Sequence, residues 1–581
     1  MEEKREVERK YEADGADVRL PDLTRVRGVA AVQDEGVTEL DAVYYDTADL
    51  RLAAASLTLR RRTGGADAGW HLKFPVATGI RDEIRAPLSD TLPEALASLL
   101  RSRVRDLPVV PVVRLVSHRD VHHLTSKDGT VLAELSTDTV HAQRLPTGPE
   151  TTWTEIEVEL ADDTEAADEA LLDAVEKRLK KAGIHRSSSP SKLARALEET
   201  GGTAGAVASA AAPPAAAARP APAAGEADAS PGGAGGPAPA AGEAGASPAP
   251  AGDDRAAKRA RRGDGGGAPG LVRVSGRGGV GDKALAPGTA GAAVLAYVRE
   301  QVDALVALDP AVRRDLPDAV HQMRVASRRL RSAFRTYGKV LDRTVTDPVG
   351  EELKWLAGEL GYARDLEVLD ARLRAALDAL PPDLHVGPVR DRLRTWAEAK
   401  GGGSRRRTLD ALDSARHLAL LDRLDALLAA PPLLPAARKD AAKVIPKAVR
   451  RDYRRLAARV DHALALDPGQ DRDLALHAAR KAAKRARYAG EAAVPTLGKP
   501  ARRFAKRMKA VQTCLGDHQD SVVARAALLD LATQAHAAGE PSFTWGVLYA
   551  REEAAAAARE HQLPEVWARA SAPEIRAALS H

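Results

Sequence analysis

Hydrophobic and polar residues alternate along several short segments of the first 200 residues. The clearest are REVERKYE, ASLTLRRRTG, GWHLKFP, IRDEIRAP, TVLAELSTD and WTEIEVEL. Successive side chains of a strand point to opposite faces of a sheet, so this period of two predicts strands. Two segments with a helical period, LPEALASLLRSRV and DEALLDAVEKRLKKAG, lie between them. We therefore expect an α+β domain with a mainly antiparallel sheet over residues 1–200.

The hydrophobic pattern changes after about residue 288. Segments such as AAVLAYVREQVDALVAL and AKRMKAVQTCLGDHQDSVVARAALLDLATQA repeat every 3.6 residues, which predicts an all-α helical bundle over residues 286–575. Between the two patterns, residues 201–285 consist mostly of Ala, Pro and Gly. Such a segment has almost no large apolar side chain to bury, so we expect a disordered linker there. The chain is thus predicted to be multidomain.

Composition adds limits on compartment and partners. The chain carries 86 Lys and Arg against 81 Asp and Glu, so its net charge of +5 must matter through local clusters. A single cysteine, Cys514, excludes an intrachain disulfide framework and favours a reducing compartment. The segment MEEKREVERKYEADG has no apolar core of the kind that signal peptides have, and no uncharged apolar run of about twenty residues occurs elsewhere. We therefore expect a soluble, cytoplasmic protein.

Alternation also places the charged residues of each strand on one face. The shared faces are those of Glu6, Glu8 and Lys10; of Arg60 and Arg62; of His71 and Lys73; of Arg81, Glu83 and Arg85; and of Glu155, Glu157 and Glu159. One such strand is typical of a solvated sheet face. Five of them, if the sheet closes into a barrel, predict a channel lined by Arg, Lys and carboxylates. Carboxylates hold hard divalent cations and Arg and Lys neutralise phosphate oxygens, which is the chemistry of a metal-bound triphosphate.

These segments resemble the CYTH family, the triphosphate tunnel metalloenzymes. EVERK matches the family's ExExK signature, and YYDTADLRLAAASLTLRRR is similar to the stretch that leads into its Arg-x-Arg strand. The later order also agrees, with Lys73 in LKFP, RDE at 81–83, EIEVE at 155–159 and Lys192 in SKLARAL. The resemblance covers residues 3–200 and implies an eight-stranded antiparallel tunnel that hydrolyses or binds triphosphates with Mg²⁺ or Mn²⁺.

The same resemblance assigns roles to individual residues. It implies that carboxylates hold metal, namely Glu6, Glu8, Asp138, Glu155, Glu157 and, as a further member, Glu159. It implies that cations bind the substrate, namely Lys10, Arg60, Arg62, Lys73, Arg81, Arg119 and Lys192, with Arg114 as an alternative to Arg119. Glu83 is expected to orient Arg or Lys side chains, and the catalytic set comprises Glu6, Glu8, Lys10, Arg60, Arg62, Lys73 and Glu83. Four histidines are expected to be structural rather than catalytic bases: His71, His118, His122 and His123.

A basic stripe occurs twice in the helical part. On a helix that advances about 100° per residue, Arg324, Arg328 and Arg331 fall within about 80° of His321, and Arg329 flanks them. HAARKAAKRARY repeats these offsets, with His477, Arg480, Lys484, Arg485 and Arg487. A Leu-Gly-x-x-x-Asp segment follows each histidine helix, in LGYARD from 360 and LGDHQD from 515. One such stripe is typical of a solvated helix face, but the duplication predicts two helical repeats that form one cationic groove.

The two repeats resemble the CHAD family, the conserved histidine α-helical domain, across residues 288–575. The resemblance implies a helical bundle that binds inorganic polyphosphate, and this family often accompanies a CYTH domain. Tyr362 and Ala363 stand where the second half has Asp517 and His518, so the halves are not expected to bind equally. The expected polyphosphate ligands are His321, Arg324, Arg328, Arg329, Arg331, His477, Arg480, Lys481, Lys484, Arg485, Arg487 and His518. Nucleic acid is a weaker expectation, because few aromatic residues near the stripes could stack on bases.

Together the two resemblances imply a metal-dependent triphosphatase joined to a polyphosphate-binding domain, with inorganic triphosphate as the leading substrate. Association with polyphosphate granules is a further expectation, and no membrane partner is expected. Two alternatives stay open: a non-catalytic polyphosphate-binding adaptor, and a tunnel that acts on thiamine triphosphate or on a nucleotide by cyclase chemistry.

Overall fold

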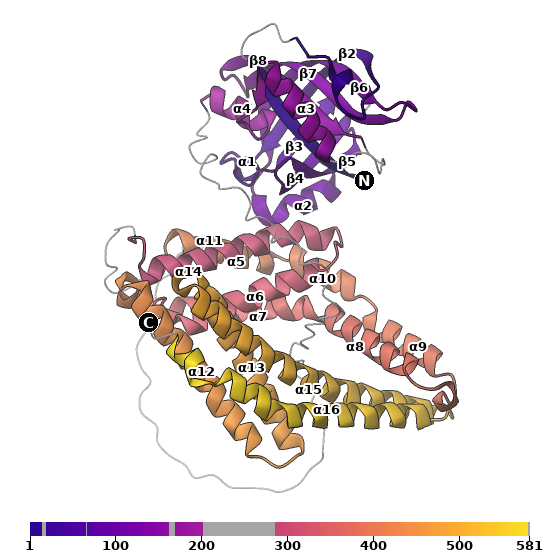
Figure 1. The fold of residues 1–581 in the computed structure, drawn as a ribbon, viewed down its shortest axis with the longest axis vertical. Coiled ribbons are helices and arrows are strands. Elements are labelled where there is room, and N and C mark those ends of the chain that lie inside the picture. Colours follow the sequence, from indigo (N-terminus) through magenta and orange to yellow (C-terminus); the bar gives the residue numbers. More distant parts are fainter. Residues whose placement is uncertain (14–18, 66, 162–168, 202–284, 579–581) are drawn as a thin grey trace, which may run out of the picture. The chain divides into compact units, whose positions relative to one another are not determined.

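The computed structural model describes residues 1–13, 19–65, 67–161, 169–201 and 285–578 (Figure 1). Almost all of the predicted linker, 201–285, lies outside the described residues, so its disorder and the predicted domain boundaries stay predictions. The described chain divides into two compact units. The first contains the described residues up to 201 together with residues 300–328 and 403–429, and the second contains residues 285–299, 329–402 and 430–578.

The strands form one antiparallel sheet that closes on itself. Their bounds are β1 Glu2–Ala13, β2 Ala31–Asp46, β3 Thr58–Thr63, β4 Gly69–Ala77, β5 Ile80–Pro87, β6 Val110–Thr125, β7 Val131–Arg144, β8 Glu150–Leu160 and β9 Ile184–Arg186. The order is β5-β4-β3-β2-β6-β7-β8-β1-β9, and β5 also pairs with β1. β1 to β8 therefore make a closed eight-stranded barrel with β9 beside β1. The predicted α+β antiparallel tunnel fold is confirmed.

The hydrophobic core of this unit lies outside the barrel, under the helices that cover it. The helices among residues 1–201 are η1 Leu23–Arg25, α1 Arg51–Ala54, α2 Glu94–Val104, α3 Glu169–Lys181 and α4 Lys192–Glu199. Val158, between two interior glutamates of β8, packs with Val175 of α3 in one cluster. Leu72 of β4 packs with Leu100 of α2 in another, and a third joins α4 to β6, β7 and β8. Each such buried side chain contributes about 1.5–3 kcal/mol, and the opposite strand face is left free for polar residues.

A buried aspartate fixes the connection that leads into β3. Asp46, at the end of β2, is fully buried and accepts backbone N–H bonds from Thr47, Leu52 and Ala53 at 2.7–2.8 Å. Burial raises the pKa of this carboxyl above its ordinary value, although the three N–H groups oppose that shift. The bonds hold α1 against the end of β2, and thereby set the start of β3 and its arginines.

From residue 290 onward the described chain is helical, as predicted. The α-helices are α5 Ala290–Arg313, α6 Ala319–Thr336, α7 Arg343–Glu359, α8 Gly361–Asp378, α9 Val389–Gly401, α10 Ser404–Asp413, α11 Ala415–Ala429, α12 Ala441–Leu464, α13 Gln470–Ala492, α14 Val494–Leu497, α15 Lys499–Ala537, α16 Phe543–Ala570 and α17 Pro573–Ala577. Two short 3₁₀ helices, η3 Pro382–Leu384 and η4 Pro435–Arg438, interrupt them. None of the described helices is long and apolar enough to cross a membrane.

The two histidine helices are α6 and α13, but the Leu-Gly-x-x-x-Asp segments that follow them differ in structure. Leu360 lies between α7 and α8, whereas Leu515 lies inside the continuous helix α15. Leucines and tryptophans of α8, α9, α15 and α16 form one buried cluster, in which the Trp396 indole N–H donates to Asp530 at 3.1 Å. This cluster sets the position of α15, whose other end faces α13.

Candidate functional site

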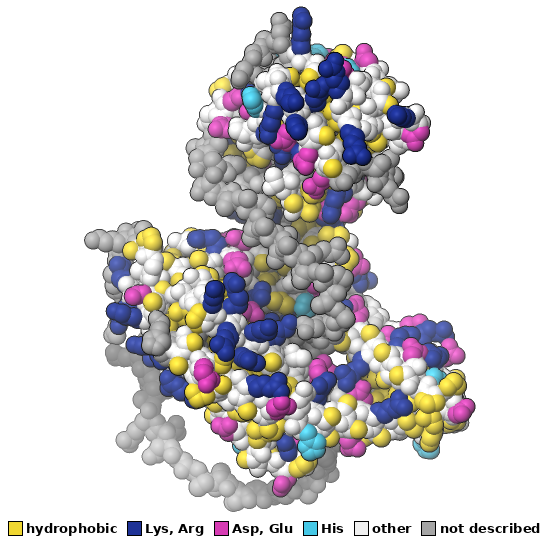
Figure 2. All heavy atoms as spheres, viewed as in Figure 1, with side chains coloured by type: hydrophobic (Ala, Val, Ile, Leu, Met, Phe, Trp, Pro, Cys, Tyr) yellow, Lys and Arg dark blue, Asp and Glu magenta, His cyan; other side chains and the backbone are white. Residues whose placement is uncertain are grey.

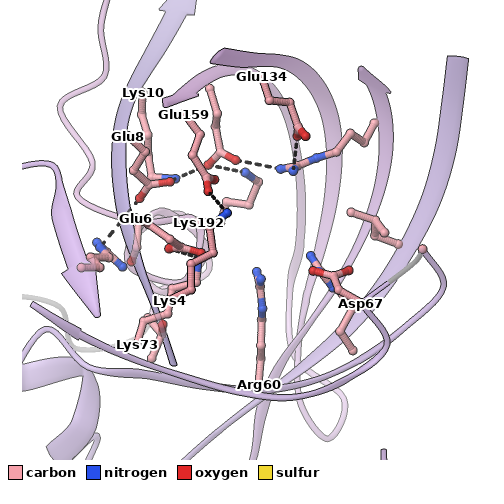
Figure 3. A pocket seen from close by; sticks show the side chains of 18 of the residues that line it. Lys4, Glu6, Glu8, Lys10, Arg60, Asp67, Lys73, Glu134, Glu159 and Lys192 are labelled. Carbon is pink, nitrogen blue, oxygen red and sulfur yellow. Dashed lines mark hydrogen bonds and ion pairs between the residues drawn. The ribbon is translucent and has the colours of Figure 1, made fainter. Parts of the chain in front are cut away.

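The barrel encloses a polar cavity of about 330 Å³ (Figure 3). Nearly all of its lining is charged or hydroxylic and comes from all eight barrel strands and the start of α4. The lining residues are Lys4, Glu6, Glu8, Lys10, Thr38, Leu40, Tyr44, Thr58, Arg60, Arg62, Gly65, Asp67, Lys73, Arg81, Arg85, Arg119, Val121, Glu134, Glu157, Glu159, Ser191 and Lys192. The strand faces that sequence alternation made charged are therefore the faces that point inward.

Two glutamates of β1 face the cavity and pair with cations of different strands. Glu6 is 2% exposed and its carboxylate lies 2.5 Å from the Lys73 ammonium of β4. Burial raises the pKa of Glu6 to about 7 even though Lys73 opposes the shift. Glu8 lies 3.2 Å from Lys10 and 3.8 Å from Arg81. Burial would raise the pKa of Glu8, but Lys10 and its other cationic neighbours outweigh burial and leave that pKa below its ordinary value.

A second group of carboxylates surrounds one lysine. Lys192 is the first residue of α4, and its ammonium lies 2.9 Å from Asp138, 2.8 Å from Glu155 and 2.6 Å from Glu157. Arg119 of β6 donates to both Asp138 and Glu157 at 2.7 Å. Burial disfavours charge on all these groups, yet the carboxylates raise the pKa of Lys192 and the cations lower that of Glu157. The group is a buried, mutually compensated set of charges.

Glu83 of β5 is the fully buried anchor of the basic side of the cavity. Its carboxylate lies 3.5 Å from the Lys73 ammonium, 3.7 Å from the Arg60 guanidinium and 2.9 Å from His71 Nδ1. The other His71 nitrogen lies 2.9 Å from the Asp67 carbonyl oxygen, and burial lowers the pKa of His71 to about 4. The geometry agrees with the orienting role expected of Glu83 and with a neutral, structural His71.

Eleven lining residues were not among the sequence candidates, and five of them are ionisable: Lys4, Tyr44, Asp67, Arg85 and Glu134. Most stand in register with a residue that was identified. Tyr44 lies opposite Arg60, its hydroxyl accepting from the guanidinium at 3.4 Å, and Glu134 lies opposite Glu159. Strand pairing was the missing signal, since a residue directly across from an inward side chain also points inward. Asp67, in the loop before β4, pairs with Arg62.

One expected substrate ligand lies outside the cavity. Arg114 is half exposed and donates from Nε and Nη2 to the two carboxylate oxygens of Asp41 on the barrel exterior. Its alternative, Arg119, lines the cavity. Arg114 and Arg119 are five residues apart on one regular stretch of β6, and an odd spacing puts two side chains on opposite faces of a strand. The choice left open by the sequence is therefore corrected in favour of Arg119.

The carboxylates suit a hard divalent cation. Oxygens of Asp138, Glu155 and Glu157 lie within 4.8 Å of one another, and Glu6 and Glu8 add carboxylates from β1. Oxygen donors of this kind are those that Mg²⁺ and Mn²⁺ prefer. Glu159, the further candidate, instead makes an ion pair with Lys4. The donor set therefore fits a metal, with Glu159 apart from the three-carboxylate group.

In the second unit, arginines of three helices form a cationic surface. They are Arg331 and Arg335 of α6, Arg455 and Arg459 of α12 and Arg485 of α13. Burial, and then repulsion from Arg335, lowers the pKa of Arg331; burial lowers that of Arg485, as do three neighbouring arginines, although Asp452 opposes the shift. Asp452 and Glu351 pair with Arg455 and Arg335, so the remaining excess of positive charge is what an anion would compensate. Figure 2 shows Lys and Arg side chains gathered on the visible face of the helical part, over the region of α13.

Other arginines of the predicted stripes are fixed by an aromatic ring and a carboxylate. Tyr488 packs under Arg329 and Arg487, with each guanidinium carbon within 6 Å of the ring centroid, and Glu491 pairs with both arginines at 3.1 Å. Lys481 is exposed, and Lys484 and His321 are half-buried. His477 is half-buried as well, and burial followed by Lys481 lowers its pKa. Burial and the neighbouring cations therefore favour the neutral form of His477.

One arginine of each predicted stripe, three residues after its histidine, is buried rather than exposed. Arg324 and Arg480 are 3% and 4% exposed. Arg480 lies against α15, where a side chain at Gly516 would begin 3.6 Å from its Nε and where Asp520 lies 3.8 Å from its guanidinium. The Leu-Gly-x-x-x-Asp segment of α15 thus seats Arg480. Arg328, in contrast, is half-buried with two of its N–H groups unbonded.

His518 does not join the cationic surface. It is buried, and its Nε2 lies 3.2 Å from both Asp473 and Glu560. A polyanion would meet two carboxylates there, which are themselves paired with Arg525 and Arg472. The expectation that His518 binds polyphosphate is therefore corrected: its acidic neighbours make it part of the packing between α13, α15 and α16.

Two family models match separate parts of the chain. The CYTH domain model matches residues 4–197 and the CHAD domain model matches residues 296–529. Two proteins of Mycobacterium tuberculosis (strains CDC 1551 / Oshkosh and ATCC 25618 / H37Rv), both named as uncharacterized, are 36% identical over 560 residues, which covers 94% of this chain and 92% of each relative.

Solved structures of partial length are also similar. PptA from Streptomyces chartreusis is 23% identical with a TM-score of 0.41, and the match covers 48% of this chain and 99% of that chain. The CHAD domain from the plant Ricinus communis is 26% identical with a TM-score of 0.36, over 51% of this chain and 93% of that chain.

Proposed function

Because this chain belongs to the proteins that join a CYTH domain, at residues 4–197, to a CHAD domain, at residues 296–529, we propose that its barrel hydrolyses inorganic triphosphate and that its helical part binds inorganic polyphosphate. CYTH domains are metal-dependent triphosphate tunnel enzymes, which sets the coarse class of the activity. The finer assignments of substrate and polymer rest on the geometry of the cavity and of the arginine surface.

The observation that carries the proposal is the internal pairing of the cavity. Every strand that lines it except β2 supplies a cation, a carboxylate or both, and oppositely charged side chains pair with one another: Lys73 with Glu6, Lys10 with Glu8 and Lys192 with the three-carboxylate group. A triphosphate brings oxygens that replace these carboxylates as partners of Arg and Lys. The carboxylates so released are oxygen donors for a cation that accompanies the substrate.

Phosphoryl transfer of this kind depends mainly on positioning and charge compensation. Arg60, Lys73 and Arg119 would hold phosphoryl oxygens, and Glu83 keeps the first two in place from behind the cavity wall. A divalent cation held by Glu6, Glu8 and the three-carboxylate group would polarise a phosphoryl oxygen. It would also offset the charge that develops on the leaving oxygen. No side chain is needed as a covalent nucleophile, and the neutral, fully bonded His71 is unsuited to act as a base.

The lining favours a bare triphosphate over one that carries an organic group. A volume of about 330 Å³ is near the lower end of the range for small-molecule pockets, roughly 300–1,000 Å³. Leu40 and Val121 are the large aliphatic residues among the lining, and Tyr44 turns its hydroxyl toward Arg60. Thiamine or adenine needs an apolar or stacking surface, which these side chains do not supply.

A substrate panel on the full chain tests the catalytic half. Phosphate release should be fastest from tripolyphosphate with Mg²⁺ or Mn²⁺, slower from thiamine triphosphate and ATP, and absent with excess EDTA. Glu6→Gln should abolish it, because the amide removes a charged carboxylate from both Lys73 and the cation. Saturable polyphosphate binding without turnover of any triphosphate would instead establish a non-catalytic binding module.

For the helical part, the proposal rests on the repelling arginines of α6, α12 and α13. A linear polyphosphate presents one anionic group after another and satisfies closely spaced guanidinium groups without base-specific contacts. Long-chain polyphosphate should therefore bind more tightly than single-stranded DNA of the same charge, and binding should weaken as salt screens the charges. Equal affinity for both polymers would contradict the assignment.

A further inference from the structure

Lys4 extends the charged face of β1 by one step beyond the Glu6-x-Glu8-x-Lys10 segment. It stands two residues before Glu6, about 6.8 Å along a strand, so its side chain points to the same side of the sheet. Lys4 lines the cavity, and Figure 3 shows its ammonium directed to Glu159 of β8. The distance from Lys4 Nζ to Glu159 Oε1 is 2.9 Å.

The Lys4–Glu159 pair marks the wetter end of the cavity. Its two side chains are 23% and 26% exposed, against 10% and 11% for Lys192 and Glu157. Glu134, which also lines the cavity and lies opposite Glu159, is 40% exposed. Exposure therefore rises from the Lys192 group toward Lys4, as it also does toward Arg85 and Asp67 at 26% and 32%, so a linear ligand held at the buried group can extend its far end to Lys4.

Glu159 stands apart from the three-carboxylate group. Oxygens of Asp138, Glu155 and Glu157 approach one another within 4.8 Å, and Glu159 is not in that group. Its carboxylate instead compensates Lys4 in the absence of ligand. An incoming phosphoryl oxygen can take the place of Glu159 as the partner of Lys4, as it would for the other lysines of the cavity.

We propose that Lys4 determines chain-length specificity by binding the phosphoryl group at the wetter end of the cavity, with Glu159 as its partner when no ligand is bound. The ligand class is linear inorganic phosphate of three or more phosphoryl groups. Pyrophosphate, held at the buried end, does not reach Lys4. This inference rests on the proposed triphosphatase function of the barrel and adds its length preference.

The test compares Lys4→Met and Lys4→Arg with Arg5→Met in the full chain. Arg5 is the next residue of β1, points out of the barrel, is 59% exposed and pairs with Asp82. Lys4→Met should raise KM at least tenfold for tripolyphosphate and further for tetrapolyphosphate, with kcat within twofold. The inhibition constant of pyrophosphate should stay within twofold. Lys4→Arg should restore KM to within threefold, and Arg5→Met should change neither constant.

Three results would overturn the inference: an unchanged KM in Lys4→Met, a fall in kcat alone, or an equal loss of pyrophosphate and tetrapolyphosphate binding. If the unaltered protein turns over no triphosphate, the proposed function fails separately. Titration calorimetry with tetrapolyphosphate then still tests Lys4, because weaker binding by Lys4→Met than by Arg5→Met supports the contact and equal binding refutes it. Matching thermal unfolding of the variants excludes misfolding as the cause.

Discussion

The Lys192 ammonium lies 2.6 Å from the Glu157 carboxylate inside the barrel, and the same nitrogen also contacts Asp138 and Glu155. One lysine at the first turn of α4 thus compensates the three carboxylates that come close enough to share a cation. The position of α4 and the charge state of the cavity are therefore set by the same contacts.

Replacing Lys192 by Met should destabilise the fold by about 3–5 kcal/mol, because three buried carboxylates lose their common partner. Mn²⁺ should restore part of this loss, since a cation can take the place of the ammonium. Chemical unfolding with and without Mn²⁺ measures both effects. Lys180→Met, at a lysine of α3 that is 53% exposed, is the control and should unfold like the unaltered protein. A Lys192→Met protein of normal stability would show that the cluster does not need compensation.

Arg60 and Arg114 form a matched pair on the inside and outside of the barrel. Arg60→Ala should lower kcat/KM for tripolyphosphate about 100-fold or more, because it removes a fixed donor from charge that develops in the reaction. Arg114→Ala removes a solvent-exposed ion pair with Asp41 and should leave turnover within twofold. Steady-state kinetics on both variants measures kcat/KM. An equal fall in kcat/KM in both would contradict binding of the substrate inside the cavity.

Charge reversal of the arginine surface should separate the two activities. Arg331→Glu with Arg485→Glu should weaken polyphosphate binding at least tenfold, or about 1.4 kcal/mol, and leave triphosphate turnover unchanged. Neighbouring arginines repel both residues, but Glu351 attracts Arg331 and Asp452 attracts Arg485, so thermal unfolding of the variant checks that the fold is kept. The control is Arg390→Glu with Arg394→Glu on α9, where both side chains are about 60% exposed. Loss of turnover in the first double variant would mean that the activities are not separable.

Polyphosphate binding should tighten as the pH falls through about 6. Burial raises the pKa of Asp520 to about 6, although Arg480 and Arg372 oppose the shift. Protonation then removes a negative charge beside Arg480 and Lys484. At pH 7.5, the Asp520→Asn variant should bind polyphosphate with the affinity that the unaltered protein has at pH 5. Its affinity should also change less between pH 5 and pH 7.5. An identical slope in both proteins would assign the pH dependence to other groups, of which His477 is the nearest candidate.

The raised pKa of Asp520 also makes the free energy of unfolding depend on pH. The folded-state pKa of Asp520 lies above its ordinary value of 3.8, so the folded chain binds this proton more tightly than the unfolded chain does. The stabilising contribution is fully present below pH 3.8 and is lost as the pH rises through about 6. Asp520→Asn should therefore unfold at a higher denaturant concentration than the unaltered protein at pH 7.5, which urea titration measures.

The interior of the barrel could be predicted largely because strand geometry has a period of two. Glu6, Glu8 and Lys10 had to share a face, and the apolar residues between them had to face the covering helices. The period alone does not say which of two residues at an odd spacing points inward, and this is why Arg114 and Arg119 could not be separated. Lys4 satisfied the same period and was missed because the recognisable signature begins at Glu6.

Helix periodicity carried less information about the arginine stripes. Angular position identifies a face but not the neighbouring helix that covers part of it, so the burial of Arg480 could not be foreseen. Gly516 and Asp520 of α15 lie against its guanidinium, and the period of α13 gives no information about that neighbouring helix. The acidic surroundings of His518 likewise come from Asp473 and Glu560, which lie 45 and 42 residues away along the chain.

The placement of the hydrophobic core outside the barrel has a consequence for how such a protein can evolve. Along β8, Glu155, Glu157 and Glu159 face the cavity while Ile156 and Val158 hold the covering helices. Substitutions at one set of alternate positions can retune the ligand without opening the apolar clusters, and substitutions at the other can adjust stability without touching the chemistry. A single scaffold can in this way acquire new phosphate substrates by small steps, each compatible with a folded intermediate.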